Sequence, residues 1–250
     1  MSANRPKNSK IRLDQLLIQR GLAESRERAK AMVMADLVQV NGFPVDKPGR
    51  LIPTSASIVT NKVSPPYASR GGLKLEAALN HFPVIIKGQA LLDVGASTGG
   101  FTDCLLKHGA HKVIAVDVGY GQLDWGLRKD PRVKVLERTN IRYLKPCDIE
   151  GTIDGAVIDV SFISLRLVVP PVSDLLRKHA FIIALIKPQF EVGKGQVGKG
   201  GVVRDPQLHQ QVVDGLSDVF RDLNWTVMGH IPSPLLGPKG NREFLIHLTR

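Results

Sequence analysis

Two lysines and two carboxylates stand where they could handle a proton. Lys187 ends the apolar run FIIALIK, and Asp159 ends the run DGAVIDV. Lys74 lies in SRGGLKLEAAL, at the start of a predicted helix, and Glu243 begins the last strand-like run, EFLIHLT. A surface charge or a helix cap explains most of them singly, but Lys187 ends a wholly apolar strand. Together they could deprotonate a weakly acidic hydroxyl, because neighbouring cations lower the pKa of a proton-accepting lysine and carboxylates orient it.

A turn of small residues lies between a strand and a helix in LLDVGASTGGFTDCLL. The strand ends at Asp93-Val94 and the helix starts near Gly100, a geometry that lets a ligand approach the backbone at the switch point of a parallel sheet. Asp117 ends the next strand, 22 residues after Gly95. A carboxylate there can accept hydrogen bonds from ribose hydroxyls. The spacing predicts a ribose-bearing cofactor, and Thr139-Asn140 after the third strand could reach its base.

The elements that position these residues alternate along the second part of the chain. Strand-like runs are ALLDVG, KVIAVDVG, VKVLE, DGAVIDV and FIIALIK, with helical stretches between them. This alternation predicts an α/β domain over residues 73–250, with a parallel, doubly wound sheet covered by helices on both faces. WTVMGHI and EFLIHLT are expected to close the sheet as an antiparallel pair at its edge.

The first part of the chain predicts a small α+β module over residues 1–62, followed by a linker over 63–72. Leu13, Leu16 and Leu17 recur at helical spacing, and LVQVNG predicts a strand entering an Asn-Gly turn. Arg26, Arg28 and Lys30 form a basic face on the second helix. Residues 1–75 hold thirteen of the 34 Lys and Arg residues but only five of the 23 Asp and Glu residues, which favours a polyanionic partner such as nucleic acid.

Composition excludes several classes of protein. The 250 residues are 43% hydrophobic, as in an ordinary globular protein, and no apolar run approaches the roughly 18 residues of a membrane helix. The start of the chain does not have the pattern of a secretion signal. Two cysteines, Cys104 and Cys147, are too few for a disulfide scaffold and indicate a reducing cytoplasm. No residue cluster indicates a metal site.

Two segments imitate other motifs. GKGQVGKGG at 193–201 nearly matches the phosphate loop G-x-x-x-x-G-K-[ST], but Gly200 replaces the hydroxyl that holds magnesium, and the next helix begins only near Asp205-Pro206. We expect Lys194 and Lys199 in this loop to grip RNA phosphates instead. SPPY at 64–67 resembles the loop of amino-methyltransferases, yet no strand-like run leads into it, so a linker is favoured.

Gly95-Ala96-Ser97-Thr98-Gly99-Gly100 resembles the turn that holds a methyl-donating cofactor, and three nucleophiles could receive a methyl group from it. A cytosine carbon would require an attacking cysteine, but Cys104 lies inside a helix and Cys147 in a polar connection, so both are interpreted as structural. An exocyclic amine would favour D-P-P-Y after the fourth strand, where this chain has Asp159-Val160-Ser161-Phe162. A ribose hydroxyl remains.

Four stretches carry resemblances to known families. Arg12-Leu13-Asp14, Ser25-Arg26, Ala29 and Val38-Gln39-Val40-Asn41-Gly42 resemble the S4-type RNA-binding domain. Gly95-Ala96-Ser97-Thr98-Gly99-Gly100 resembles motif I of S-adenosylmethionine-dependent methyltransferases. Lys74, Asp159, Lys187 and Glu243 resemble the tetrad of FtsJ-type ribose 2′-O-methyltransferases. With SRGGLKL, DVSFISL, LIKPQFE and GNREFL, nearly the whole chain resembles the TlyA family, ribosomal RNA 2′-O-methyltransferases acting on cytidines and historically labelled hemolysins.

The resemblance implies a set of site residues. Catalysis is expected from Lys74, Asp159, Lys187 and Glu243, with Lys187 as the proton acceptor. S-adenosylmethionine is expected at Asp93, Gly95, Ser97, Thr98, Gly99, Gly100, Phe101, Asp117, Asn140 and Asp159. RNA contacts are expected from Arg12, Arg26, Arg28, Lys30, Arg70, Lys194 and Lys199, with the ribosomal subunit as partner.

Other functions stay open at this point. A non-catalytic RNA-binding ribosome factor would need only the first module. A membrane-lysing hemolysin would need an amphipathic or apolar segment, which the sequence does not show. Pseudouridine synthases often carry a similar first module, but the S-adenosylmethionine-type turn argues against that class. The target nucleotide, the subunit and the oligomeric state do not follow from the sequence.

Overall fold

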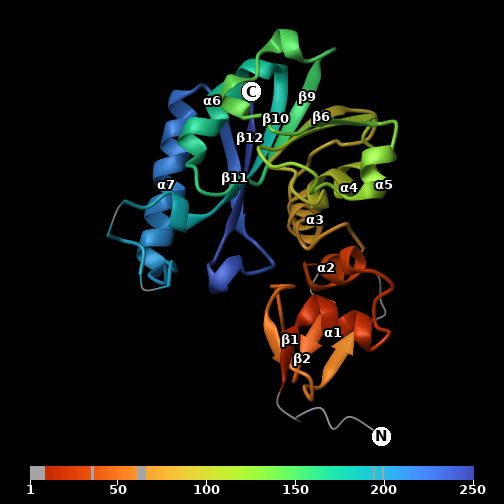
Figure 1. Cartoon of the computed structure of the whole chain (residues 1–250). Helices are drawn as coiled ribbons and strands as arrows, with labels where there is room; N and C mark the ends of the chain where they lie inside the picture. The colour runs from red at the N-terminus through yellow and green to blue at the C-terminus, as the bar shows by residue number, and fades with distance from the viewer. Residues whose placement is uncertain (1–8, 35–36, 61–65, 194, 199) are drawn as a thin grey trace, which may run out of the picture. The chain divides into compact units, whose positions relative to one another are not determined.

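The protein is described by a computed structural model covering residues 9–34, 37–60, 66–193, 195–198 and 200–250. The chain divides into two compact units, Met1–Arg70 and Gly71–Arg250 (Figure 1). This division falls inside the segment 63–72 expected as a linker.

The first unit packs two helices against short strands. Leu13, Leu16 and Leu17 of the first helix are buried together with Ala29 and Val33 of the second, as the helical spacing predicts. Ser25 caps the second helix by accepting a hydrogen bond from the Arg28 backbone amide. Its elements are β1 Lys10–Arg12, α1 Leu13–Gln19, α2 Arg26–Met34, β2 Val38–Val40, β3 Phe43–Pro44, β4 Leu51–Pro53 and β5 Ile58–Thr60, with β1 pairing β4 and a sheet in the order β3-β2-β5.

The hairpin predicted at Asn41-Gly42 is present. Both residues have positive φ, 52° and 82°, which is the conformation that a tight turn between β2 and β3 requires. Asn and Gly tolerate that conformation best, so the dipeptide fixes the register of the hairpin.

The second unit is built on one seven-stranded sheet in the order β11-β12-β10-β9-β6-β7-β8. All neighbours are parallel except β12, which is antiparallel to both β10 and β11. The predicted parallel sheet and its antiparallel closing pair are therefore confirmed, although β12 lies inside the sheet and only β11 lies at the edge. The strands are β6 Ala90–Val94, β7 Lys112–Val116, β8 Val133–Leu136, β9 Ile153–Ile158, β10 Leu176–Ile186, β11 Thr226–Pro232 and β12 Phe244–Thr249.

Helices cover both faces of this sheet, as the alternation predicts (Figure 1). One face carries α3 Gly71–His81, α4 Gly100–Lys107 and α5 Trp125–Lys129, and the other carries α6 Leu165–Leu175 and α7 Pro206–Asp222. Short 3-10 turns are η1 Ile141–Tyr143, η2 Pro146–Asp148, η3 Pro188–Phe190 and η4 Pro238–Gly240. The main core lies between the sheet and α6 and α7, where Val169, Val172, Leu216 and Phe220 are buried.

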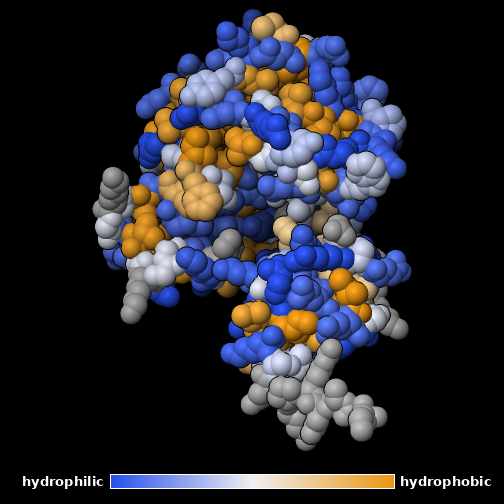
Figure 2. Space-filling model, viewed as in Figure 1, coloured by the Kyte–Doolittle hydropathy of each residue, from blue (hydrophilic) through white to orange (hydrophobic). Residues whose placement is uncertain are grey.

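On the face seen in Figure 2, the second unit shows apolar patches set among strongly hydrophilic side chains. Within the described ranges, no helix has both the length and the apolar character needed to span a bilayer.

Candidate active site

The glycine turn after β6 has the backbone that the sequence predicts. Gly95, Ser97 and Gly99 have positive φ, of 86°, 48° and 94°, and α4 starts directly after them at Gly100. A Cβ at Gly95 would collide with the carbonyl oxygen of Asp159. Glycine there allows the ends of β6 and β9 to approach one another, which brings Asp159 beside the turn.

A pocket of about 450 Å³ opens where β6, β7, β8 and β9 end. Parallel strands present their carboxyl ends on one edge, and that is where open α/β sheets bind ligands. The volume is within the usual range for a small-molecule site. The lining is Val94, Gly95, Ser97, Val116, Asp117, Val118, Gln122, Thr139, Asn140, Ile141, Asp159, Val160, Ser161, Phe162, Ile163 and Val168.

Asp117 lines this pocket and accepts hydrogen bonds from two backbone amides beside it. Its Oδ2 accepts a hydrogen bond from the Ser97 backbone amide at 2.7 Å, and its Oδ1 accepts one from the Gly119 amide at 2.7 Å. A carboxylate oxygen can accept two hydrogen bonds, so each retains capacity for a ligand hydroxyl. The carboxylate of Asp117 therefore has the acceptor capacity that its predicted role in binding ribose hydroxyls requires.

Asp93 is fully buried beneath the turn. Thr102 donates a hydrogen bond of 2.6 Å to its Oδ2, while its Oδ1 has no partner among the described residues. The pKa of this carboxyl is raised to about 7: burial is the largest cause, the nearby Asp159 carboxylate also raises the pKa, and the hydrogen bond from Thr102 lowers it. A buried carboxylate oxygen without a partner suits a cationic hydrogen-bond donor, and S-adenosylmethionine carries an ammonium group. Its ribose also offers two hydroxyls that Asp117 could accept hydrogen bonds from, and its adenine could lie against the apolar side chains of the pocket. The residues present therefore fit this cofactor.

Five of the ten expected cofactor residues do not line the pocket: Asp93, described above, and four residues of the turn and the start of α4. Thr98, Gly99, Gly100 and Phe101 turn into α4 and its packing: Phe101 is buried, and a Cβ at Gly99 would collide with Leu127. The turn resembles a motif whose spacing identifies the loop but does not say which of its residues touch the ligand. A cofactor contact from these residues stays a prediction, and Asp93 reaches a ligand only from below the lining.

Lys187 follows β10 immediately and is 8% exposed. Its Nζ lies 2.6 Å from Oδ1 of Asp159 and donates a hydrogen bond of 2.9 Å to Oγ of Ser161. Because Asp159 lines the pocket, this ion pair places an amine directly behind a lining residue. Lys187 and Asp159, each predicted to end an apolar strand, therefore form an ion pair at the ends of β10 and β9.

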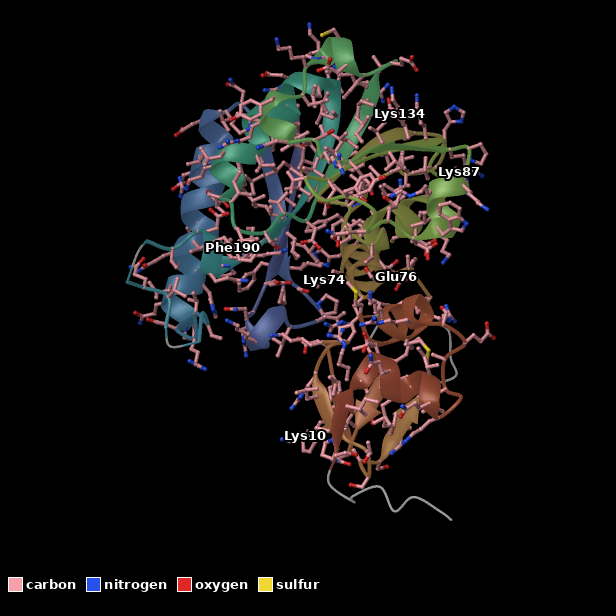
Figure 3. All side chains as sticks on the ribbon, viewed as in Figure 1. Lys10, Lys74, Glu76, Lys87, Lys134 and Phe190 are labelled. Atoms are coloured by element: carbon pink, nitrogen blue, oxygen red, sulfur yellow. The ribbon has the colours of Figure 1, made fainter. Side chains whose placement is uncertain are left out.

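Lys74 and Glu243 form the second lysine–carboxylate pair, with Nζ 2.5 Å from Oε2. Glu243 is buried, and its Oε1 has no hydrogen-bond partner within the described parts of the chain. Figure 3 shows Lys74 and Phe190 away from Lys87 and Lys134. Lys87 lies just before β6, and Lys134 lies near the start of β8.

Sheet register brings the two pairs to the same edge. Ile186 pairs with Phe244, so Lys187 and Glu243 are the next residues on adjacent strands. Ala184 pairs with Ile158, one residue before Asp159. All four predicted residues thus gather at the ends of β9, β10 and β12, with Lys74 joined from α3 through its ion pair.

Three residues near this cluster were not foreseen. Ser161 contacts Lys187, and Phe162, which lines the pocket, is 90% exposed with φ of 64°. The Phe162 ring lies 5.0 Å from that of Phe190. Glu191 accepts hydrogen bonds from Ser164 Oγ and the Leu165 amide, and burial raises its pKa. Ser161 and Phe162 lie in DVSFISL, which begins at Asp159, and Glu191 ends LIKPQFE, so both motifs were the available signal.

The loop at 193–201 is not a phosphate loop. Gly198 and Val202 form an isolated bridge, and α7 begins only after Asp205, which caps it by accepting from the Gln207 amide. Asn241 anchors the segment by donating to the Gly201 carbonyl and accepting from the Val203 amide. The expected RNA-gripping residues Lys194 and Lys199 lie outside the described residues.

The basic residues of the first unit divide into two groups. Arg12 and Arg26 both form ion pairs with buried Asp14, at 2.8 and 3.2 Å, and the hydrogen bonds of Arg12 lower the pKa of Asp14 to about 2. Both arginine side chains are still partly exposed, at 40% and 46%, so RNA binding by Arg12 and Arg26 stays a prediction beside this structural role. Arg28, Lys30 and Arg70 are exposed at the surface.

Neither cysteine lines the pocket. Cys104 is buried in α4 and Cys147 is exposed in η2. Across the described ranges, no group of three or more His, Cys, Asp or Glu side chains is placed to hold a metal ion.

Known proteins resemble this chain over most of its length. The FtsJ-like methyltransferase family matches residues 67–250, and the S4 domain matches residues 11–58. The "16S/23S rRNA (cytidine-2'-O)-methyltransferase TlyA" of Mycobacterium tuberculosis is 48% identical over 96% of this chain and 90% of its own length. "Hemolysin A" of Brachyspira hyodysenteriae is 39% identical over 95% of this chain and 99% of its own.

Solved structures agree. A Streptococcus thermophilus protein with a provisional hemolysin name superposes with a TM-score of 0.77 at 45% identity, covering 97% of this chain and 89% of that one. An S-adenosylmethionine-dependent methyltransferase from Mesorhizobium loti shares the fold of the second unit, with a TM-score of 0.51 at 10% identity over 71% of this chain and 98% of that one. The chain therefore belongs to the FtsJ-like methyltransferase family, whose cofactor is S-adenosylmethionine, and carries an S4 domain at its N-terminal end.

Proposed function

We propose that this protein methylates a ribose 2′-hydroxyl of cytidine in ribosomal RNA. The observation that carries the proposal is the pair of lysine–carboxylate contacts at the pocket edge, Lys187 with Asp159 and Lys74 with Glu243. The relative from Mycobacterium tuberculosis is named for cytidine 2′-O-methylation of 16S and 23S rRNA, and its extensive identity supports the same substrate class here. Such a substrate implies action in the cytoplasm.

S-adenosylmethionine, when bound, supplies an electrophilic methyl group. Asp117 would accept hydrogen bonds from its ribose hydroxyls, Asn140 and Thr139 would border its base, and the free Oδ1 of Asp93 would face its ammonium group. The chain's own task is to orient the RNA hydroxyl and remove its proton as the new oxygen–carbon bond forms.

Lys187, in its neutral form, accepts the proton of the 2′-hydroxyl at Nζ. Asp159 and Ser161 fix the direction of that nitrogen from two sides, at 2.6 and 2.9 Å. Lys74 holds a positive charge next to the oxygen that becomes an ether, and buried Glu243 keeps Lys74 in place. The exposed ring of Phe162 provides an apolar surface beside this centre on which a base can stack.

The test uses tritiated S-adenosylmethionine with separately purified small subunits, large subunits and naked ribosomal RNA from cells that lack the gene. We expect label at a position that resists alkaline cleavage, since a methylated 2′-oxygen cannot attack the neighbouring phosphate. The labelled fraction identifies the subunit. Cofactor binding without label in any fraction would contradict this substrate, and failure to bind the cofactor would favour a non-catalytic RNA-binding factor.

The hemolysin name of one relative suggests a second function, lysis of membranes. Purified protein mixed with dye-filled vesicles tests it directly. Dye release at the protein concentrations that suffice for methylation would support lysis, whereas intact vesicles would leave RNA methylation as the only function with a chemical site.

A further inference from the structure

The exposed aromatic rings of the second unit gather around the cofactor pocket. Within the described part of Gly71–Arg250, the aromatic side chains with large exposure are Tyr120, Trp125, Tyr143 and Phe162. Phe162 itself lines the pocket, and each of the other three lies within three residues of a lining residue. An exposed aromatic ring does not contribute the free energy that its burial would add to folding. Four such rings around one pocket therefore indicate a binding surface rather than a contribution to stability.

Three of the rings carry a cation on their face. The Arg138 guanidinium lies 4.3 Å from the Tyr120 ring centre, the Arg142 guanidinium 5.4 Å from Tyr143, and the Lys129 amine 4.8 Å from Trp125. All six side chains are exposed. We call these three pairs the aromatic rim.

Nearby carboxylates do not neutralise the rim. Glu137 pairs with Arg128, Asp130 pairs with Arg132, and Asp124 caps α5 by accepting from two backbone amides. The rim therefore presents aromatic faces together with a net positive charge. That combination fits the bases and phosphates of unpaired nucleic acid, where bases stack on rings and cations meet the backbone.

The backbone beneath the rim is fixed before any ligand arrives. The Arg138 amide donates to the Gly119 carbonyl, and the Gly121 amide donates to Glu137. Arg138 also has φ of 53°, an uncommon conformation for a non-glycine residue, and it directs the guanidinium from the end of β8 over the ring that follows β7. A preformed surface loses less conformational entropy on binding.

From these contacts we propose that the aromatic rim binds the unpaired nucleotides flanking the target ribose. The inference rests on the proposed function and specifies its substrate: RNA must present the target within a single-stranded or locally opened segment. Tyr120 and Tyr143 each stack a base of the flanking strand, and Arg138 and Arg142 beside these rings contact the phosphates. Duplex RNA with buried bases binds the same protein less tightly.

The test measures binding of the full chain to a fluorescently labelled single-stranded RNA and to the duplex of the same sequence. We expect Tyr120→Ala and Tyr143→Ala each to weaken single-strand binding about tenfold, and Tyr120→Phe to retain it. Arg138→Gln should reduce the slope of log affinity against log salt by about 0.7, since one phosphate contact is lost. A 2-aminopurine base in the RNA should lose fluorescence on binding wild type and lose less with Tyr120→Ala.

Arg250→Gln is the matched control. Arg250 also carries its cation over an aromatic ring, 4.9 Å from the centre of Trp225. It follows β12, which ends at the amino ends of the parallel strands, away from the pocket. This variant should bind RNA as wild type does. Because the rim residues are exposed, thermal unfolding of every variant should also match wild type.

Equal binding of single strand and duplex, or wild-type binding by Tyr120→Ala and Tyr143→Ala, would overturn the inference. So would a loss of binding to anionic lipid vesicles in these variants with RNA binding intact, which would assign the rings to a membrane surface. Methyl transfer by wild type is measured alongside: its absence would count against the proposed function, whereas the binding comparison decides the rim by itself.

Discussion

Replacing Lys187 with arginine is the sharpest perturbation of the site. Arginine keeps a positive charge for Asp159 and donors for Ser161, but a guanidinium does not give up its proton in proteins. If Lys187 accepts the hydroxyl proton, Lys187→Arg should lose turnover while keeping the ion pair. A positioned general base contributes about 10²- to 10⁴-fold, which corresponds to about 3 to 5 kcal/mol of barrier.

Lys187→Ala separates chemistry from folding. Removing one partner of a fully buried ion pair costs about 3 to 5 kcal/mol, but the Asp159 side chain is 22% exposed, and water access should reduce the loss to about 1 to 2 kcal/mol. We expect Lys187→Ala to unfold at a lower temperature, and Lys187→Arg to unfold near wild type. Both should bind S-adenosylmethionine within a few-fold of wild type, since Lys187 does not line the pocket.

The assays are single-turnover methyl transfer to ribosomal subunits, calorimetric titration with the cofactor, and thermal unfolding. Wild-type turnover by Lys187→Arg would refute proton acceptance at Nζ, because no deprotonated form would then be needed. If a Lys187 variant lost as much cofactor affinity as turnover, the result would instead refute the claim that Lys187 acts in the reaction without contributing to cofactor binding.

Four further outcomes follow from individual contacts. Asp117→Asn should weaken S-adenosylmethionine binding at least tenfold in a titration, because an amide offers only one acceptor oxygen and one of the two amides that Asp117 holds loses its partner. Asp93→Asn should flatten the pH dependence of stability without ligand: the folded pKa of about 7 exceeds the unfolded value, so stability should fall as pH rises from about 4 to 7, and denaturant titrations across that range measure it. Asp14 behaves in the opposite way, since its folded pKa of about 2 is depressed; its contribution is present above pH 4 and is lost towards pH 2, and Asp14→Asn should abolish that acid transition in the first unit. Phe162→Ala should raise the KM for RNA about tenfold; because Phe162 also lines the cofactor pocket, cofactor affinity is measured alongside, and an unchanged KM would remove Phe162 from the substrate surface.

Most of the fold was predictable because its elements differ sharply in local pattern. Runs such as FIIALI at 181–186 are apolar at every position, as strands buried on both faces must be, and Asp205-Pro206 is a strong helix start. The position of β12 between β10 and β11 was not predictable. Antiparallel pairing of two neighbours in sequence says nothing about which of them contacts the rest of the sheet.

The site was predictable in its residue types and less so in its contacts. Lys187 and Asp159 stand out because charges rarely end apolar strands. Arg12 and Arg26 looked like surface charges, but their shared partner Asp14 is buried, and only tertiary structure reveals that. Ser161 was missed for the same reason, since its bond to Lys187 joins residues 26 positions apart. Phe101 and Gly99 belong to the motif that the sequence identifies, but neither lines the pocket. The motif identifies the loop without showing which of its residues face a ligand.

The antiparallel direction of β12 is what allows the second lysine–carboxylate pair to reach the first. In a wholly parallel sheet, the residue preceding a strand lies at the amino edge, far from the cofactor. Because β12 runs against β10, Glu243 precedes its strand at the carboxyl edge, one step beyond the Ile186–Phe244 pair. Asn241, two residues earlier, ties the segment after η3 to the same place. The reversed strand therefore converts a position that would be structural in a parallel sheet into one that can hold Lys74 beside the reacting hydroxyl.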